Sequence, residues 1–167
     1  IIFGGRLTDN QLEKAASLKF HQTFATGVDR HNLSFYKKRG IILCNSHAHS
    51  KTIAEYGFAL LLAASKELIA NDRLLRDGIW NYRQYPSVSL FGKTIVFLGY
   101  GKIAQEVKKL CEPFEMKYIA IKRTKECADT SVKVYLPEEK LDALKLGDFI
   151  FNALPLTSQT IDFLDEE

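Results

Sequence analysis

The segment Gly99-Tyr100-Gly101-Lys102-Ile103-Ala104 has the spacing G-x-G-x-x-A. In such a segment the first glycine permits a tight turn and the second lets the backbone approach a pyrophosphate. The small third residue lets a helix pack closely on a strand. Amides near the helix start would face the phosphates at its positive end. The pattern indicates a dinucleotide site, although a plain strand–helix turn also explains two glycines. The candidate cofactor-binding residues are Gly99, Gly101, Lys102 and Ile103.

A basic segment, Lys122-Arg123-Thr124-Lys125, follows the glycine loop (residues 99–104). An NAD site usually has an acidic residue about twenty residues past the first glycine, where it binds the ribose 2′-hydroxyl. Here that window holds no acid, and Lys122 stands in the acid's place. Arg123 and Thr124 offer a forked donor and a hydroxyl suited to a 2′-phosphate. We therefore expect NADP to be preferred over NAD, with NAD as the less favoured cofactor. The alternative is a solvated basic turn.

The elements around the glycine loop fit this interpretation. Residues 94–98 are a β-branched and aliphatic run typical of a buried strand, and the apolar residues from Ile103 to Cys111 fall on one helical face. Residues 116–121 and 149–151 predict further strands, and residues 137–146 predict a helix with Pro137 in its first turn. This alternation predicts an α/β fold with a Rossmann-type, doubly wound parallel sheet.

The first fifty residues repeat the alternation. Strands are predicted at residues 1–3, 18–24 and 41–44, separated by a helix that Thr8 caps and by a helix over residues 31–39 that Gly40 ends. A second parallel sheet is therefore expected there.

A long helix is predicted between these two parts. Thr52 and Glu55 have the spacing of a capping box, and the apolar pattern continues to about Arg76, with Gly78 as the stop. Residues 82–90 have no helical period and predict an extended arm. The predicted divisions are a first α/β part at 1–51, a connecting helix and arm at 52–87, and a Rossmann-type part at 88–167.

The histidines give weaker indications. His47 and His49 resemble a ligand pair, but no Cys or acidic residue lies nearby at a metal-site spacing, so no metal site is expected. His21 falls on a predicted strand and His31 at a predicted helix start. We therefore expect core and cap roles for them instead of catalysis.

Composition excludes several classes of protein. The hydrophobic content of 46% is enough for a real core, and a net charge of +3 is too small to indicate nucleic-acid binding. No apolar run reaches the length of a membrane span, and no secretory signal opens the sequence, so we expect a cytoplasmic protein with no membrane partner. Cys44, Cys111 and Cys127 form no C-x-x-C pair and are expected to be reduced thiols.

Five stretches together carry a family resemblance. They are Ala25-Thr26-Gly27-Val28-Asp29; Ile53-Ala54-Glu55 leading into residues 59–62; residues 74–80; Leu90-Phe91-Gly92-Lys93-Thr94 before the glycine loop; and Leu154-Pro155-Leu156-Thr157 with Thr160. In this order they resemble the D-isomer-specific 2-hydroxyacid dehydrogenases, which include glyoxylate/hydroxypyruvate reductases and phosphoglycerate dehydrogenases. The likeness covers nearly the whole chain.

The resemblance implies a partial, flavodoxin-like substrate domain at 1–51, an interdomain helix and arm at 52–87, and an incomplete Rossmann domain at 88–167. The active site would lie in the cleft between the two domains. It implies hydride transfer between a nicotinamide cofactor and a small 2-keto or D-2-hydroxy acid, and a homodimer. Backbone amides at Thr26 and Gly27 would hold the substrate's carboxylate. Leu154, Pro155 and Thr160 would flank the cofactor.

The family's catalytic arginine, acid and histidine are expected to follow Glu167, so no catalytic residue is assigned within this chain. We expect the sequence to be the middle of a longer enzyme, with a strand and a helix before Ile1. The alternative is a non-catalytic, corepressor-like protein that binds a dinucleotide and transfers no proton.

Overall fold

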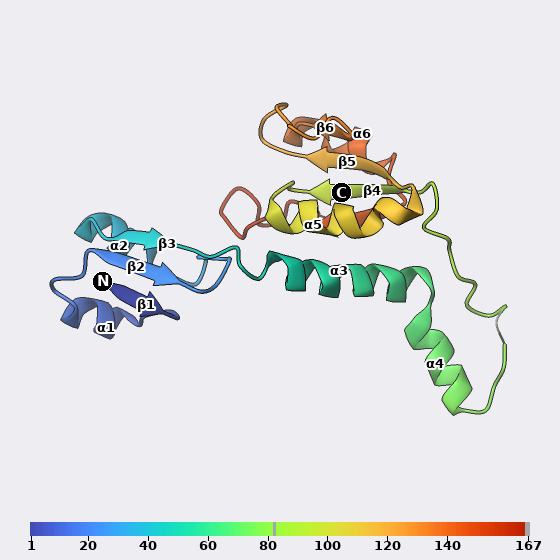
Figure 1. Cartoon of the computed structure of the whole chain (residues 1–167), viewed down its shortest axis with the longest axis horizontal. Helices are drawn as coiled ribbons and strands as arrows, with labels where there is room; N and C mark the ends of the chain where they lie inside the picture. The colour runs from blue at the N-terminus through green and yellow to red at the C-terminus, as the bar shows by residue number, and fades with distance from the viewer. Residues whose placement is uncertain (82, 166–167) are drawn as a thin grey trace. The chain divides into compact units, whose positions relative to one another are not determined.

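A computed structural model of the chain describes residues 1–81 and 83–165 (Figure 1). Its contacts divide into two compact units. The first consists of Ile1–Ser50 with Leu154–Glu167, and the second is Lys51–Ala153. The predicted arm at residues 82–90 begins at Tyr82, which lies outside the described residues.

The first unit contains a three-stranded parallel sheet in the order β1-β2-β3. The strands are β1 (Ile2–Gly4), β2 (Phe20–Thr23) and β3 (Ile42–Cys44), and the helices are α1 (Asp9–Lys14) and α2 (Leu33–Arg39). Thr8 caps α1 in a capping box with Gln11, and Gly40 ends α2 with a left-handed φ of 62°. The parallel sheet predicted for this region is therefore confirmed, with β2 shorter than expected.

The second unit contains a four-stranded parallel sheet in the order β6-β5-β4-β7. The strands are β4 (Thr94–Leu98), β5 (Lys117–Ile121), β6 (Val132–Tyr135) and β7 (Phe149–Asn152). Numbered from β4, this is the order 3-2-1-4 of the first four strands of a Rossmann sheet. The predicted Rossmann-type α/β fold is confirmed. Two short 3₁₀ segments and α6 (Lys140–Leu144) lie between the strands: η1 (Glu112–Phe114) and η2 (Pro137–Glu139).

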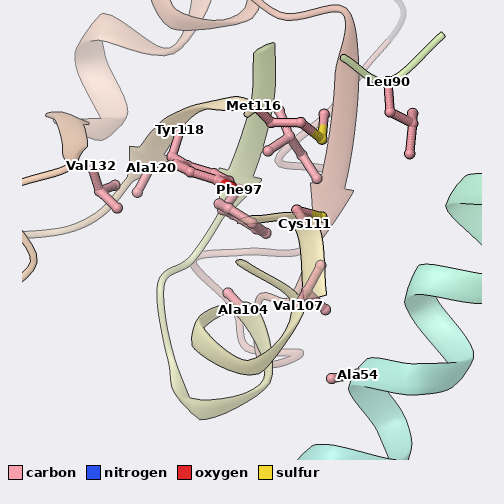
Figure 2. Packing of buried hydrophobic residues seen from close by; sticks show 11 residues of the cluster. Ala54, Leu90, Phe97, Ala104, Val107, Cys111, Met116, Tyr118, Ala120 and Val132 are labelled. Carbon is pink, nitrogen blue, oxygen red and sulfur yellow. The ribbon is translucent and has the colours of Figure 1, made fainter. Parts of the chain in front are cut away.

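The core of the second unit lies between the sheet and α5 (Lys102–Cys111). Ala104, Val107 and Cys111 of α5 are fully buried with Phe97 of β4, as the face predicted from the sequence requires (Figure 2). Ala54 belongs to the same cluster. Burying this apolar surface stabilises the sheet–helix sandwich that holds the glycine loop.

The helical region after Ser50 differs from the prediction. The helix α3 (Ser50–Ser65) begins before Thr52, so Thr52 lies inside it and is not the helix cap that the capping-box spacing predicted. The prediction of a single long helix is also wrong. The helix breaks where Glu67 adopts a left-handed φ of 51°, and α4 (Leu68–Arg76) follows. The predicted stop is confirmed, since Gly78 follows α4 with a φ of 72°.

Gly57 lets α3 approach the sheet closely. A Cβ at this position would lie 2.6 Å from Cε2 of Phe151 on β7 and 4.0 Å from Cγ2 of Val107 on α5. The other side of α3 exposes Tyr56 and Leu60. None of the described helices is long and apolar enough to cross a membrane.

Candidate dinucleotide site

The glycine loop continues directly from β4. The Gly99 amide donates to the Ile121 carbonyl at 3.0 Å, which extends the β4–β5 ladder by one bond. Gly99 then adopts a φ of 80°, a left-handed conformation that side chains rarely take. The first glycine of the motif is therefore required by the turn itself.

Gly101 is different, because its backbone is ordinary. Its φ of −85° and ψ of −169° are extended, and no atom lies within 4 Å of the position that a Cβ would occupy. Neither the backbone nor the packing of this chain requires a glycine there. The open space at Gly101 is instead what a pyrophosphate needs in order to approach the backbone. The observed loop therefore fits a dinucleotide.

The start of α5 offers unsatisfied donors beside this space. Gly101 is the N-cap residue and provides no side-chain hydrogen bond to the first turn, which also contains no acidic residue. The amides of Lys102 and Ile103 lie in that turn, where an α-helix leaves its N–H groups without internal partners. Such a terminus favours an anion. Ala104 is fully buried, so the third motif position does bring the helix close to the sheet.

The loop lies where the strand order reverses. β4 is flanked by β5 on one side and by β7 on the other, although β7 comes much later in the chain. The Ala153 amide donates to the Leu98 carbonyl at 3.0 Å, so the chain leaves β7 at the edge where the glycine loop begins. Open α/β sheets bind ligands in the crevice at this switch point.

In the basic segment after β5, some side chains have polar partners within the protein and others have none among the described residues. Lys122 donates to the carbonyl of Glu126, and Lys125 forms an ion pair with Glu139 at 2.7 Å. Arg123 and Thr124 are exposed, and neither makes a side-chain hydrogen bond or ion pair to the described part of the chain. Among the described residues of this segment, Arg123 is therefore the cation without a side-chain partner, whereas Lys122 bonds within its own turn.

A polar cluster surrounds Asp129, and no motif in the sequence indicates it. The Tyr100 hydroxyl donates to Oδ2 of Asp129 at 3.0 Å, and Nζ of Lys108 lies 3.2 Å from the same oxygen. Lys108 also pairs with Glu112 at 3.0 Å. The cluster thus joins the glycine loop, α5 and the segment between β5 and β6.

The candidate substrate residues lie in the loop after β2. Asn45 donates its side-chain amide to the Thr26 carbonyl at 2.7 Å, and the Ser46 amide donates to the Ala25 carbonyl at 3.1 Å. A Cβ at Gly27 would lie 2.7 Å from Oδ1 of Asp29. The segment after β3 therefore fixes the backbone of this loop, and Gly27 is exposed.

The remaining candidates follow β7. Leu154 is partly buried and Pro155 is exposed. The Thr160 hydroxyl donates to the Pro155 carbonyl and accepts from the Thr157 amide at 2.9 Å. The Thr160 side chain therefore stabilises the turn over residues 155–160. These residues belong to the first compact unit, whereas the predicted division places them within residues 88–167.

The histidines take largely structural positions. His21 is fully buried on β2 and its Nδ1 lies 2.6 Å from the Tyr36 hydroxyl. His31 is also buried, but Asn32 and not His31 caps α2, so the cap role expected for His31 is wrong. His47 and His49 are exposed in a turn. No group of three or more metal-ligating side chains occurs within residues 1–81 and 83–165.

A family model matches this fold and loop directly. The NAD-binding domain of the D-isomer-specific 2-hydroxyacid dehydrogenases matches residues 58–167. The chain belongs to this family. The resemblance identified from the sequence motifs is therefore confirmed, and the glycine loop is that of an NAD-binding domain of the D-2-hydroxyacid dehydrogenase type.

Curated relatives in the same family include a glyoxylate reductase of Pyrococcus furiosus, 29% identical over 97% of this chain and 51% of its own length. A hydroxypyruvate reductase of Thermotoga maritima is 30% identical over 97% of this chain and 52% of its own. A D-3-phosphoglycerate dehydrogenase of Methanocaldococcus jannaschii is 32% identical over 98% of this chain and 32% of its own. The chain thus spans about half the length of the two reductases, and about a third of the third relative.

Solved structures share the family's fold. An acyclic imino acid reductase in complex with NADPH and D-Arg has a TM-score of 0.81 at 24% identity, covering 94% of this chain and 52% of its own. The NAD-dependent formate dehydrogenase from Staphylococcus aureus, in complex with NAD, has the same TM-score and identity over 98% of this chain and 51% of its own. These neighbours support the fold, and they include proteins with either cofactor.

Proposed function

We propose that the chain acts in an NAD(P)-dependent oxidoreductase that interconverts a small 2-keto acid and the matching D-2-hydroxy acid. The acids would be of the glycerate, glyoxylate or hydroxypyruvate type, and two relatives are named as a glyoxylate reductase and a hydroxypyruvate reductase. The observation that carries the proposal is the open space at Gly101, beside an uncapped helix start, in a family defined by this chemistry.

The proposed roles of the candidate residues differ between the two units. Gly99, Gly101, Lys102 and Ile103 would receive the pyrophosphate on backbone amides, while Leu154, Pro155 and Thr160 would flank the cofactor. Thr26 and Gly27 would hold the substrate's carboxylate through their amides, which the neighbouring segment after β3 keeps in place. The bound cofactor supplies the hydride. Residues 1–51 would then form part of the substrate domain, 52–87 the connection and 88–167 part of the cofactor domain.

We further propose that NADP is preferred over NAD and that Arg123 provides the preference. Two observations support this. No acidic residue lies in the window after β5, and Arg123 has no competing partner within the described residues, unlike Lys122 and Lys125. A hydrogen bond to a charged group contributes about 1.5–3 kcal/mol before screening, so a preference of roughly tenfold is expected.

A homodimer is also proposed, through the segment that includes α4. Leu68, Ile69, Leu75, Ile79 and Trp80 are all exposed there, and Trp80 has 79% of its surface accessible. Exposed apolar residues gathered in one segment are typical of an association surface. Sedimentation of the unmodified protein and a Trp80→Glu variant tests it, and a monomer at all concentrations would contradict the proposal.

The function is tested by titrating the unmodified protein with NADPH and NADH, followed by an absorbance assay with glyoxylate and hydroxypyruvate. We expect NADPH to bind about tenfold more tightly, and Arg123→Ala to remove most of that difference. Lys140→Ala, which removes a cation outside the candidate site, is the charge-matched control. Tighter binding of NADH would refute the NADP preference. Tight binding without turnover by the full-length protein would instead favour a non-catalytic, corepressor-like role.

A further inference from the structure

The segment between β5 and β6, residues 122–131, is held at three points. Lys122 bonds to the Glu126 carbonyl within the segment, and Lys125 pairs with Glu139 at 2.7 Å. The third point is Asp129, two of whose partners, Tyr100 and Lys108, lie outside the segment on the glycine loop and on α5. We call residues 122–131 the selectivity loop, because they include Arg123.

Both carboxylate oxygens of Asp129 accept hydrogen bonds. Oδ1 accepts from the amide and the hydroxyl of Ser131, at 3.1 and 2.5 Å. Oδ2 accepts from the Tyr100 hydroxyl at 3.0 Å and lies 3.2 Å from Nζ of Lys108. Hydrogen bonds from Ser131, and then from Tyr100 and Lys108, lower the pKa of Asp129 to about 2 against the opposing effect of burial. The acceptor is therefore a carboxylate throughout the neutral range.

Tyr100 is itself part of the glycine loop, between Gly99 and Gly101. Its ring packs on Phe97 of β4, with centroids 5.7 Å apart, so the side chain has a fixed direction. Its hydroxyl then reaches a residue 29 positions later in the chain. The hydrogen bond thus sets the distance between the loop proposed to hold the pyrophosphate and the loop that carries Arg123.

We propose that Tyr100 and Asp129 are positioning residues for cofactor selectivity, holding the selectivity loop so that Arg123 can meet a 2′-phosphate. The inference rests on the proposed function and extends it to residues that touch no phosphate. Arg123 is exposed and without a partner in the described structure, so it is ordered only through its backbone. A loop ordered beforehand loses less conformational entropy on binding, which strengthens the interaction.

The decisive variant is Tyr100→Phe, which removes the hydroxyl and keeps the ring on Phe97. Tyr118→Phe is a matched control, because the Tyr118 hydroxyl is buried without a hydrogen-bond partner among the described residues. Tyr118 also contacts the same cluster, with Nζ of Lys108 5.1 Å from its ring centroid. Binding of NADPH and NADH and the thermal midpoint without nucleotide are measured for each protein.

We expect Tyr100→Phe to weaken NADPH binding by about three- to tenfold and NADH binding by less than about twofold. Tyr118→Phe should leave the ratio of the two affinities unchanged. Asp129→Asn should lower the ratio as well, and combining it with Tyr100→Phe should add little, since both substitutions weaken one interaction. A purely structural role would lower the thermal midpoint and weaken both nucleotides equally.

The outcomes separate this inference from the proposed function. If the unmodified protein prefers NADPH but Tyr100→Phe leaves the affinity ratio intact, the positioning role is refuted and the proposed function stands. Equal weakening of both nucleotides refutes it too. If the unmodified protein binds neither nucleotide, the proposed function fails and this inference fails with it.

Discussion

Replacing Gly101 by alanine separates the binding role of the glycine loop from its structural role. The new methyl group would meet no atom within 4 Å, and the backbone at φ −85° accepts any residue. The free energy of unfolding should therefore change by less than about 0.5 kcal/mol. In the complex, however, the methyl group would occupy the space that a pyrophosphate needs. Losing one charge-assisted hydrogen bond costs about 1.5–3 kcal/mol, so the Kd for the nucleotide should rise at least about tenfold.

Gly99→Ala should behave in the opposite way. Its φ of 80° strains an alanine by about 1–2 kcal/mol, so the fold itself should lose stability. Calorimetric titration with NADPH, together with urea denaturation of the free protein, measures both effects. Gly5→Ala is a suitable control, since a Cβ there also meets no atom within 4 Å. Undiminished affinity in Gly101→Ala would refute the reasoning and leave the loop as a structural turn.

Two further predictions concern stability. Gly147→Ala would bring a Cβ within 2.5 Å of Cγ2 of the buried Val96, so urea denaturation should show a loss of about 1–3 kcal/mol, and an unchanged midpoint would contradict this packing. Burial, and then the nearby His21 and Arg6, lower the pKa of His31 below 6.5. The unfolded chain therefore binds more protons, and the first unit should be fully stable above pH 6.5 and lose stability as the pH falls below it. Hydrogen exchange at pH 7.5 and 5.5 tests this, and His31→Leu should flatten the dependence.

The glycine loop could be predicted because its determinants are local. The run Thr94–Leu98 forms β4, Gly99 makes the turn, and α5 begins three residues later with its apolar face from Ile103. By contrast, β6 (Val132–Tyr135) was not predicted. It is four residues long, and its pairing with β5 depends on tertiary structure.

The break between α3 and α4 could not be predicted for a related reason. The apolar pattern continues from Leu62 into Leu68, and Glu67 adopts a left-handed conformation that sequence patterns associate with glycine or asparagine. The contact of Tyr100 with Asp129 is another tertiary feature, since neither residue type nor spacing distinguishes this aspartate from others. From the sequence, Lys122 and Arg123 are equally plausible partners for a 2′-phosphate. The structure distinguishes them, because Lys122 donates to the Glu126 carbonyl.

The reactivity of Cys111 can report how often the core of the second unit opens. Its thiol is fully buried, and burial raises its pKa to about 11, so a thiol reagent can modify it only when α5 detaches from the sheet. A nucleotide that binds only the closed form divides the population of the open form by 1 + [L]/Kd. The rate at which Cys111 is modified would then measure cofactor affinity with no added probe, while the partly exposed Cys44 and Cys127 give the rate of reaction without opening.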